Sequence, residues 1–464
     1  MKIDKALLKN KVIISIVATY VILAIYPILF FTGTTHNLEN NLAVLDVSRS
    51  SVLFTFDSVF LLFIVMVPFM LLLILIVKRR LRILKEAIIV LLLFMLIITP
   101  SLSIVNNFII HAEPERETPL LNKVIIITFD GTRADAFWKH ADFIIAHKNE
   151  GTWAKRIVCT YPTVTYPNHV SLFTGTWPQY HGTESNPTEY RSVQFMLRVY
   201  REPKAQDIFT VAENYEIATA IFTAPQTLAQ ILGGSATYRY SGGAGGEVVS
   251  EAINFMISNK ATIESKGLLA FIHIVDTDDI MHQYGTDSVQ YFSAIKGAAD
   301  LVGQIYDVIH DLGWENDTAI IVTADHGATD RRHYGVWPVM VADTPLWLWG
   351  RAFKKNYELG GGRIIDIAPT VAYILGIPPP AQSKGIVLYS AFDESYIESK
   401  RGIDVDLNAL AKGALNKALL DETIEIYLWG FLTLTMIWII LIEANYAFRS
   451  IKLLAIEEKR KKAK

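Results

Sequence analysis

Four long apolar stretches constrain this chain of 464 residues more than any other feature of its sequence. A helix needs roughly 20 consecutive apolar residues to cross a bilayer, and each stretch approaches that length. The stretches predicted to be transmembrane helices are residues 12–31, 58–77, 87–110 and 426–442. The fourth is short, but its aromatic residues are suited to anchoring it at the membrane interface: Tyr427, Trp429 and Trp438.

The basic residues predict how the chain is oriented in the membrane. The turn between the second and third stretches is rich in lysine and arginine, as is the tail at residues 449–464, whereas residues 32–51 are nearly free of both. Because cytoplasmic loops are enriched in basic residues, we place the N-terminus, the turn and the tail inside. The first stretch could also be a signal peptide, but no small-residue cleavage site follows it, so we interpret it as a retained anchor.

This layout predicts a multi-pass protein with three parts. They are a membrane domain at residues 1–111, an extracytoplasmic domain at 112–421, and a fourth transmembrane helix with a basic tail at 422–464. The membrane would be the plasma membrane, or that of the endoplasmic reticulum in a eukaryotic cell. The lone Cys159 excludes an intrachain disulfide, so we expect a hydrophobic core and bound metal to hold the exported domain together.

Short apolar runs alternate with helical patterns between residues 112 and 421. The runs at 124–129, 268–274, 319–323 and 345–349 are typical of buried strands, and residues 288–312 form the longest helical pattern. This alternation predicts an α/β domain with a mostly parallel sheet covered by helices on both faces. In such sheets, ligands bind outside the carboxyl ends of the strands. The glycine-rich residues 242–246 predict a flexible surface loop.

Carboxylates follow the first three predicted strands, and histidines follow two of them. A single aspartate at a strand end is usually a turn residue, but three strand ends that converge on aspartate and histidine predict a metal site. Oxygen and imidazole ligands suit zinc best, with manganese or another divalent ion as a weaker candidate. The candidate ligands are Asp130, Asp278, His282, Asp325, His326 and His333, with Asp276 and Asp279 as alternatives to Asp278.

Thr165 is the candidate nucleophile. It stands two residues before Pro167, and the run that follows ends at Gly175, which predicts a helix that begins near Thr165. The positive end of a helix favours an alkoxide or a bound phosphate, although a threonine there is more often a simple cap. A divalent cation would lower the pKa of the hydroxyl, and two metals about 4 Å apart can hold the attacking and leaving oxygens of a displacement at phosphorus.

At these residues the chain resembles the alkaline phosphatase superfamily, and within it the type I phosphodiesterase/nucleotide pyrophosphatase group. The resemblance covers about residues 122–390 and is strongest at 162–169, followed by Gly175, His181 and Asn186. It implies an alkaline-phosphatase-like fold, a phosphorylated Thr165 and a hydrogen bond from Asn186 to a phosphate oxygen. It also implies two divalent metal ions, one held by Asp130, Thr165, Asp325 and His326, the other by Asp278, His282 and a further histidine.

The third histidine of the second metal departs from the pyrophosphatase pattern. That group places it in a His-Gly pair after a Leu-Gly-Ile-Pro turn, but here residues 375–378 are followed by Ser383, Lys384 and Gly385. This part resembles the glycosylphosphatidylinositol ethanolamine phosphate transferases, in which an Asp-His-Gly motif is soon followed by another histidine. The resemblance implies that His333 is the third ligand. That family usually has many spans after the catalytic domain, whereas one is predicted for this chain.

Together these features predict a membrane-anchored, zinc-dependent, phosphodiester-cleaving enzyme with a threonine nucleophile. The membrane anchor favours transfer of a phosphoethanolamine-like group to a glycolipid or envelope glycan. Its partners would be the lipid bilayer, a phosphodiester or phospholipid donor and a glycan acceptor, with no nucleic acid polymer. A nucleotide pyrophosphatase that hydrolyses soluble phosphodiesters is the alternative, and an inactive membrane scaffold with the same fold is a second alternative.

Overall fold

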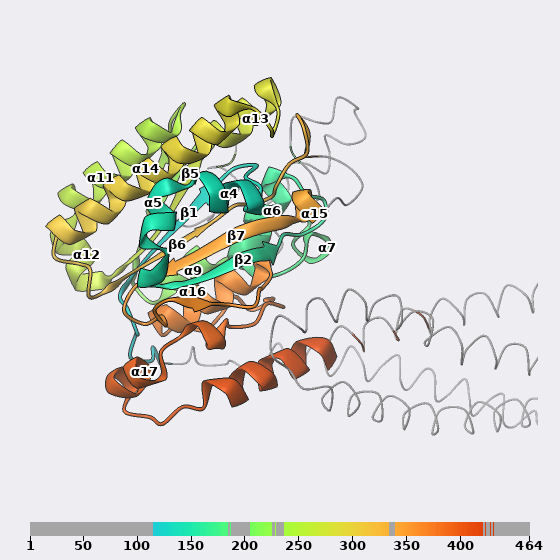
Figure 1. Cartoon of the computed structure of the whole chain (residues 1–464). Coiled ribbons are helices and arrows are strands. Elements are labelled where there is room, and N and C mark those ends of the chain that lie inside the picture. The colour runs from blue at the N-terminus through green and yellow to red at the C-terminus, as the bar shows by residue number, and fades with distance from the viewer. Residues whose placement is uncertain are drawn as a thin grey trace, which may run out of the picture. The chain divides into compact units, whose positions relative to one another are not determined.

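A computed structural model of the chain describes residues 115–183, 205–224, 236–333 and 339–420, with a few single positions that include Asn186 (Figure 1). The chain divides into two compact units, Met1–Ala411 and Lys412–Lys464, and the sheet with its covering helices belongs to the first. Three of the predicted transmembrane stretches lie outside the described residues, as does the fourth except for Tyr427 and Gly430. Among the helices that are described, none is both long and apolar enough to cross a bilayer.

An eight-stranded mixed sheet forms the centre of the domain, in the order β4-β3-β5-β1-β6-β7-β2-β8. The first five strands of this order are parallel, whereas β7 runs antiparallel to both β6 and β2. The predicted mostly parallel sheet and its four predicted strands are confirmed. The strands are β1 (Lys123–Phe129), β2 (Thr152–Val158), β3 (Ala218–Thr223), β4 (Tyr238–Ser241), β5 (Leu268–Ile274), β6 (Thr318–Thr323), β7 (Asp343–Trp349) and β8 (Tyr357–Glu358).

The three central strands β5, β1 and β6 are aligned residue for residue. Lys123 pairs with Leu268 on one side and Thr318 on the other, and the register continues to the strand ends. All residues of these strands are buried, which explains their nearly continuous apolar sequences. Because aligned parallel strands end at one edge of the sheet, the residues that follow β1, β5 and β6 lie close together.

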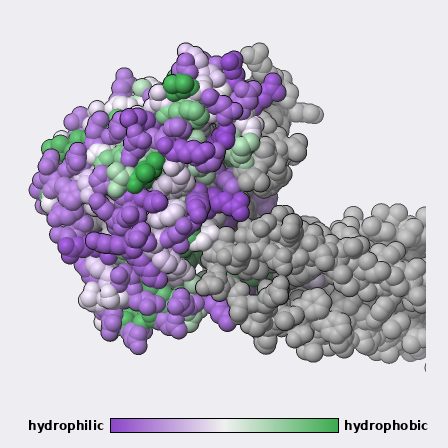
Figure 2. All heavy atoms as spheres, viewed as in Figure 1, coloured by the Kyte–Doolittle hydropathy of each residue, from purple (hydrophilic) through white to green (hydrophobic). Residues whose placement is uncertain are grey.

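Helices cover both faces of the sheet, as predicted (Figure 1). Alternate residues of β1 enter different hydrophobic cores, because successive side chains of a strand point to opposite faces. Val124 and Ile126 pack in one core and Ile125 and Ile127 in the other. The first core includes α6 (Thr165–Thr174), α9 (Ile208–Asn214) and α16 (Ile367–Leu375), and the second includes α4 (Ala134–His140), α5 (Asp142–His147), α11 (Gly245–Ser258) and α14 (Val289–Asp311). The face seen in Figure 2 is mostly hydrophilic with isolated apolar residues, as expected where these two cores hold the apolar side chains.

The helices have the following bounds. They are α4 (Ala134–His140), α5 (Asp142–His147), α6 (Thr165–Thr174), α7 (Pro178–His181), α9 (Ile208–Asn214), α11 (Gly245–Ser258), α12 (Lys260–Lys266), α13 (Asp276–Tyr284), α14 (Val289–Asp311), α15 (Val339–Ala342), α16 (Ile367–Leu375) and α17 (Glu394–Arg401). Three short 3₁₀ helices are also described, at Lys148–Glu150, Ile364–Asp366 and Tyr389–Ala391. Helix α14 confirms the helix predicted at residues 288–312, and the Ser288 side chain caps it by accepting a hydrogen bond from the Tyr291 N–H.

The loop prediction at residues 242–246 is wrong in its second half. Gly245 and Gly246 are the first two residues of α11. The Gly245 N–H donates a hydrogen bond of 2.7 Å to the Asp276 carboxylate, and a Cβ on Gly245 would collide with that carboxylate. Glycine is therefore required at this position because the backbone approaches a side chain closely, and the predicted flexibility does not explain it.

Candidate active site

Helix α6 places Thr165 at its first turn, which confirms the predicted helix start. The residue before it, Val164, is extended, and the helix ends at Gly175, whose φ of +66° suits glycine. All ten residues of α6 are buried, and only 7% of the Thr165 surface is exposed. The Thr165 hydroxyl therefore lies in a largely water-excluded environment at the positive end of a helix.

The first group of candidate metal ligands surrounds this hydroxyl. The Thr165 Oγ1 atom lies 3.5 Å from Asp130 Oδ1 and 3.4 Å from His326 Nε2. His326 Nε2 is also 3.3 Å from Asp325 Oδ2, and the ligand atoms of Asp130, Asp325 and His326 all lie within 4.8 Å of one another. Asp130 follows β1, and Asp325 and His326 follow β6, so the aligned strand ends bring this predicted set together.

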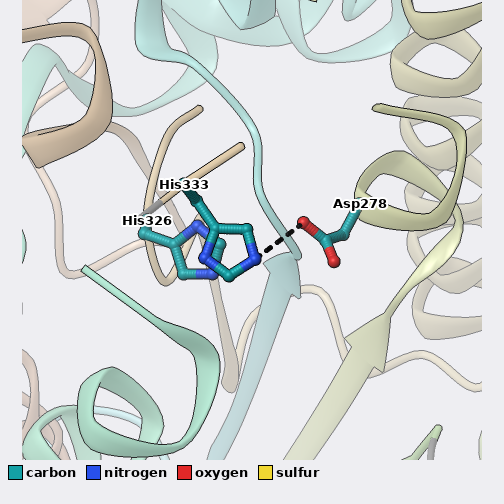
Figure 3. Close-up of side chains that lie close together, drawn as sticks. All are labelled: Asp278, His326 and His333. Carbon is teal, nitrogen blue, oxygen red and sulfur yellow. Dashed lines mark ion pairs between the residues drawn. The ribbon is translucent and has the colours of Figure 1, made fainter. Parts of the chain in front are cut away.

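The second group lies next to the first. Asp278, His326 and His333 have ligand atoms within 4.8 Å of one another, and Figure 3 shows Asp278 facing the two histidine rings, which are stacked with centroids 4.3 Å apart. His333 Nε2 is 3.9 Å from Asp278 Oδ1. His282 Nε2 is 3.3 Å from Asp278 Oδ2 and 3.1 Å from His333 Nε2. His326 thus belongs to both groups, whereas the sequence predicts it in the first alone.

The three histidine rings are oriented alike. Each places Nδ1 near a backbone carbonyl: His326 near Gly327 at 2.9 Å, His282 near Arg331 at 3.0 Å, and His333 near Thr163 at 3.3 Å. A carbonyl oxygen only accepts hydrogen bonds, so these contacts favour the tautomer with the proton on Nδ1. The Nε2 lone pairs then face the carboxylates, which is the arrangement that histidine ligands of a metal require.

The cluster is electrostatically unusual. Burial and repulsion from Asp130 raise the pKa of both Asp278 and Asp325. Burial acts on Asp130 in the same direction, but a hydrogen bond from His273 and the charges of nearby histidines hold its pKa below the usual range. Burial lowers the pKa of His333 to about 3, whereas the hydrogen bond to Asp278 raises the pKa of His282 to about 9.

Two further observations show that these residues fit a divalent cation. The buried oxygens Asp278 Oδ1 and Asp325 Oδ2 have no hydrogen-bond partner among the described residues. Gly131, with a φ of +61°, passes so close behind Asp278 that a Cβ would lie 2.5 Å from Oδ1. Buried carboxylate oxygens without hydrogen-bond partners are costly unless a cation compensates their charge. The two groups of donors can therefore hold divalent metal.

Asn186 lies beside the start of α6. It is 8% exposed, and its Oδ1 accepts a hydrogen bond of 3.0 Å from the backbone N–H of Tyr166, the residue after Thr165. The other branch of the Asn186 side chain ends in the amide nitrogen Nδ2, which can donate a hydrogen bond. This position is compatible with the hydrogen bond to phosphate that the sequence predicts.

The structure also separates the aspartates of α13. Asp278 lies in the cluster, whereas Asp276 accepts a hydrogen bond from Gly245 and Asp279 is exposed. Asp278 and His282 are four residues apart and share one helix face, as predicted. Asp278 is therefore the aspartate of α13 that contributes a carboxylate to the cluster.

Two histidines of the motif around Thr165 have structural partners. His169 is buried between the Thr165 carbonyl at 2.8 Å and the Thr128 hydroxyl at 3.0 Å. His181 contacts the Ser171 hydroxyl at 2.9 Å. A third histidine, His273, is not among the site residues predicted from the sequence, yet it contacts Asp130 Oδ2 at 2.9 Å. The position of His273 inside an apolar strand could have indicated such a contact, because a buried polar group needs a hydrogen-bond partner.

Residues 383–385 stand where the pyrophosphatase pattern has its third histidine, and they lie far from the Thr165 hydroxyl. The backbone N–H groups of Lys384 and Gly385 donate to the Gly175 carbonyl, at 2.7 and 2.9 Å. Gly175 is at the opposite end of α6 from Thr165, and ten residues at about 1.5 Å each separate the two ends by about 15 Å. His333, in contrast, is within hydrogen-bond distance of His282.

The site combines a mixed, mostly parallel α/β sheet, a threonine at a helix N-terminus and a cluster of aspartates and histidines at the strand ends. Residues 124–344 match the family model of the type I phosphodiesterase / nucleotide pyrophosphatases. These residues thus form a domain that matches this family model, and the match confirms the resemblance seen in the motifs.

The chain is homologous to two groups of curated proteins. It is 25% identical to human GPI ethanolamine phosphate transferase 1 over 336 residues, which cover 60% of this chain and 34% of that protein. It is 26% identical to rat ectonucleotide pyrophosphatase/phosphodiesterase family member 1 over 220 residues, which cover 44% and 24% of the two chains. The chain therefore spans about a third and a quarter of the length of these relatives.

Solved structures of similar fold include murine ectonucleotide pyrophosphatase / phosphodiesterase 5, with a TM-score of 0.46 and 18% identity over 55% of this chain and 96% of that one. Another is the lipoteichoic acid synthase LtaP from Listeria monocytogenes, with a TM-score of 0.45 and 14% identity over 66% and 93% of the two chains.

Proposed function

We propose that the chain is a membrane-anchored, zinc-dependent enzyme that cleaves phosphodiesters with Thr165 as its nucleophile. The observation that carries this proposal is the position of Thr165 Oγ1, within 3.5 Å of both Asp130 and His326 at a helix N-terminus. The homologues support an enzyme of this kind, because they are named as phosphodiesterases and ethanolamine phosphate transferases.

The residues around Thr165 have different proposed roles in binding metal and stabilising charge. Asp130, Asp325 and His326 would hold one zinc ion, and Asp278, His282 and His333 the other, with His326 close to both. Zinc, when bound, supplies positive charge that lowers the pKa of a hydroxyl and neutralises phosphate. The positive end of α6 and the Asn186 amide stabilise negative charge on the phosphate oxygens.

The reaction proceeds in two displacements at phosphorus. The Thr165 oxygen bonds to phosphorus while the bond to the leaving alkoxide breaks, and the proton of the Thr165 hydroxyl ends on that alkoxide, so that an alcohol departs and the threonine carries the substituted phosphoryl group. The oxygen of an acceptor hydroxyl then bonds to the same phosphorus, the bond to Thr165 breaks, and the acceptor proton ends on the Thr165 oxygen. Both displacements depend mainly on positioning and charge neutralisation, and need few other catalytic groups. A buried site of this kind provides the positioning and the charge neutralisation.

We favour transfer of a phosphoethanolamine-like group to a glycolipid or envelope glycan. The four apolar stretches favour a membrane-anchored protein that works at the bilayer, with its catalytic domain on the extracytoplasmic side of the plasma membrane or the endoplasmic reticulum membrane. The donor would be a phospholipid or another phosphodiester. Similarity to the human GPI ethanolamine phosphate transferase 1 supports this choice.

Hydrolysis of soluble nucleotides is the second candidate function, and the similarity to the rat pyrophosphatase/phosphodiesterase supports it. An inactive membrane scaffold is disfavoured, because a site without function has no need for buried carboxylate oxygens that lack a hydrogen-bond partner among the described residues.

The test is an assay of the purified full-length chain with nitrophenyl phosphodiester and monoester substrates, with and without chelator. Thr165→Ala should lower turnover by several orders of magnitude, and Thr165→Ser should retain a part of it. Thr174→Ala, at the other end of α6, is the matched control and should keep activity. A labelled phosphoethanolamine phospholipid with a glycolipid acceptor separates transfer from hydrolysis. Full activity of Thr165→Ala, or full activity in chelator, would overturn the proposal.

A further inference from the structure

His273 is a polar side chain in the middle of a strand that is otherwise apolar. Strand β5 reads Leu-Leu-Ala-Phe-Ile-His-Ile, and His273 is completely buried in it. Burying an imidazole is costly unless both ring nitrogens find partners, and an aliphatic residue would fit this strand at no such cost. The partners of His273 therefore indicate why a histidine is present.

The ring of His273 reaches both neighbouring strands. β5 lies between β3 and β1 in the sheet. On one side, Nδ1 contacts the carbonyl of Ala224, the residue after β3. On the other side, Nε2 lies 2.9 Å from Oδ2 of Asp130, the residue after β1. Because the carbonyl and the carboxylate both accept hydrogen bonds, His273 links the ends of the two strands by donating from both ring nitrogens, which requires a proton on each.

The contact with His273 separates the roles of the two Asp130 oxygens. Oδ2 is held by His273, whereas Oδ1 faces Thr165 Oγ1 and His326 Nε2, each at 3.5 Å. The Asp130 backbone is fixed as well, because its N–H donates to the Ile274 carbonyl at 3.0 Å. A carboxylate that is bound on one oxygen and anchored at its backbone has little freedom to rotate.

We propose that His273 is a positioning residue of the active site. It holds Asp130 so that Oδ1 is presented to the metal beside Thr165, and it does not itself touch metal or substrate. This inference rests on the proposed function, because it assumes that Asp130 binds metal. Outer partners of metal ligands typically contribute 10–100-fold to metal affinity.

Two substitutions separate the two contacts of His273. In His273→Gln, the amide nitrogen of glutamine lies near the position of Nε2 and keeps a donor for Asp130. In His273→Asn, the amide nitrogen of asparagine lies near the position of Nδ1 and keeps only the contact with Ala224. We expect His273→Asn to weaken zinc binding about 10–100-fold and His273→Gln to bind within a few-fold of wild type. His181→Gln is the matched control, a buried histidine outside the cluster, and should leave zinc affinity unchanged.

Zinc affinity is measured on the full-length chain by competition with a chelator of known affinity, and thermal unfolding in excess chelator reports on folding separately. His273→Leu is a further variant, because leucine suits the apolar strand, and it should bind zinc as weakly as His273→Asn. If wild type binds no zinc, the proposed function fails. If wild type binds zinc but the Asn and Leu variants bind it equally well, or the Gln variant binds it as weakly as they do, the positioning role of His273 is overturned.

Discussion

Replacing Gly131 with alanine tests the position of the Asp278 carboxylate. Gly131 has a φ of +61°, and a Cβ on it would lie 2.5 Å from Asp278 Oδ1, whereas real Cβ contacts essentially never fall below 3.0 Å. The carboxylate must then retreat by about 0.5 Å, which exceeds the tolerance of about 0.2 Å in metal–ligand distances. The left-handed backbone costs alanine about 1–2 kcal/mol in addition.

The matched control for this change is Gly402→Ala. Gly402 has a φ of +64°, and a Cβ there would meet no atom within 4 Å. When thermal unfolding is measured in chelator, Gly402→Ala should lose about 1–2 kcal/mol of stability from the backbone alone, and Gly131→Ala should lose at least as much because of its added contact with Asp278. Only Gly131→Ala should also lose metal affinity, by about 10–100-fold in a chelator competition assay. Equal metal affinity of the two variants would refute the placement of Asp278 as a ligand.

Three further predictions concern pH, thiol chemistry and helix capping. Because Asp278 raises the pKa of His282 from 6.5 to about 9, the stabilisation by this pair is complete below pH 6.5 and lost as the pH rises to about 9. Thermal unfolding in chelator should show this loss in wild type and not in His282→Gln, and parallel curves would contradict it. Burial raises the pKa of the Cys159 thiol, so a thiol reagent should modify the native protein far more slowly than the denatured protein, and equal rates would count against this burial. Asp207 caps α9 by accepting a hydrogen bond from the Thr210 N–H at 2.8 Å, so Asp207→Ala should cost about 0.5–2 kcal/mol in thermal unfolding and Asp207→Asn much less; an unchanged Asp207→Ala would exclude the cap.

The sequence predicts the central strands well because both of their faces are buried. β1, β5 and β6 are nearly continuous apolar runs, and the Ser288 cap marks the start of α14. It does not predict β2, whose exposed Lys155 and Arg156 interrupt the apolar pattern, or the four-residue strand β4. A strand with one exposed face leaves a weaker apolar signal than one that is buried on both.

The candidate site is predictable in its residue types but not in its contacts. Aspartates and histidines after three strands indicate the site, since aligned parallel strands end together. The choice of Asp278 over its neighbours depends on which face of α13 points inward, and the position of His326 between the two groups depends on side-chain directions. The sequence shows that His273 is a polar residue in an apolar strand, but it does not show that its partner is Asp130, because the two residues lie on neighbouring strands. The transmembrane helices remain predictions.

The strand order has a consequence for synthesis. β6 enters the sheet between β1 and β7, although most of the domain has been made before it. A nascent chain that ends before Thr318 already contains the proposed nucleophile and two carboxylates of the cluster, but β1 still has an open edge and Asp325 and His326 have not yet been made. Metal binding at the proposed site must therefore wait for the insertion of a late central strand. Any fragment that stops short of β6 should have an unprotected sheet edge and lack part of that site.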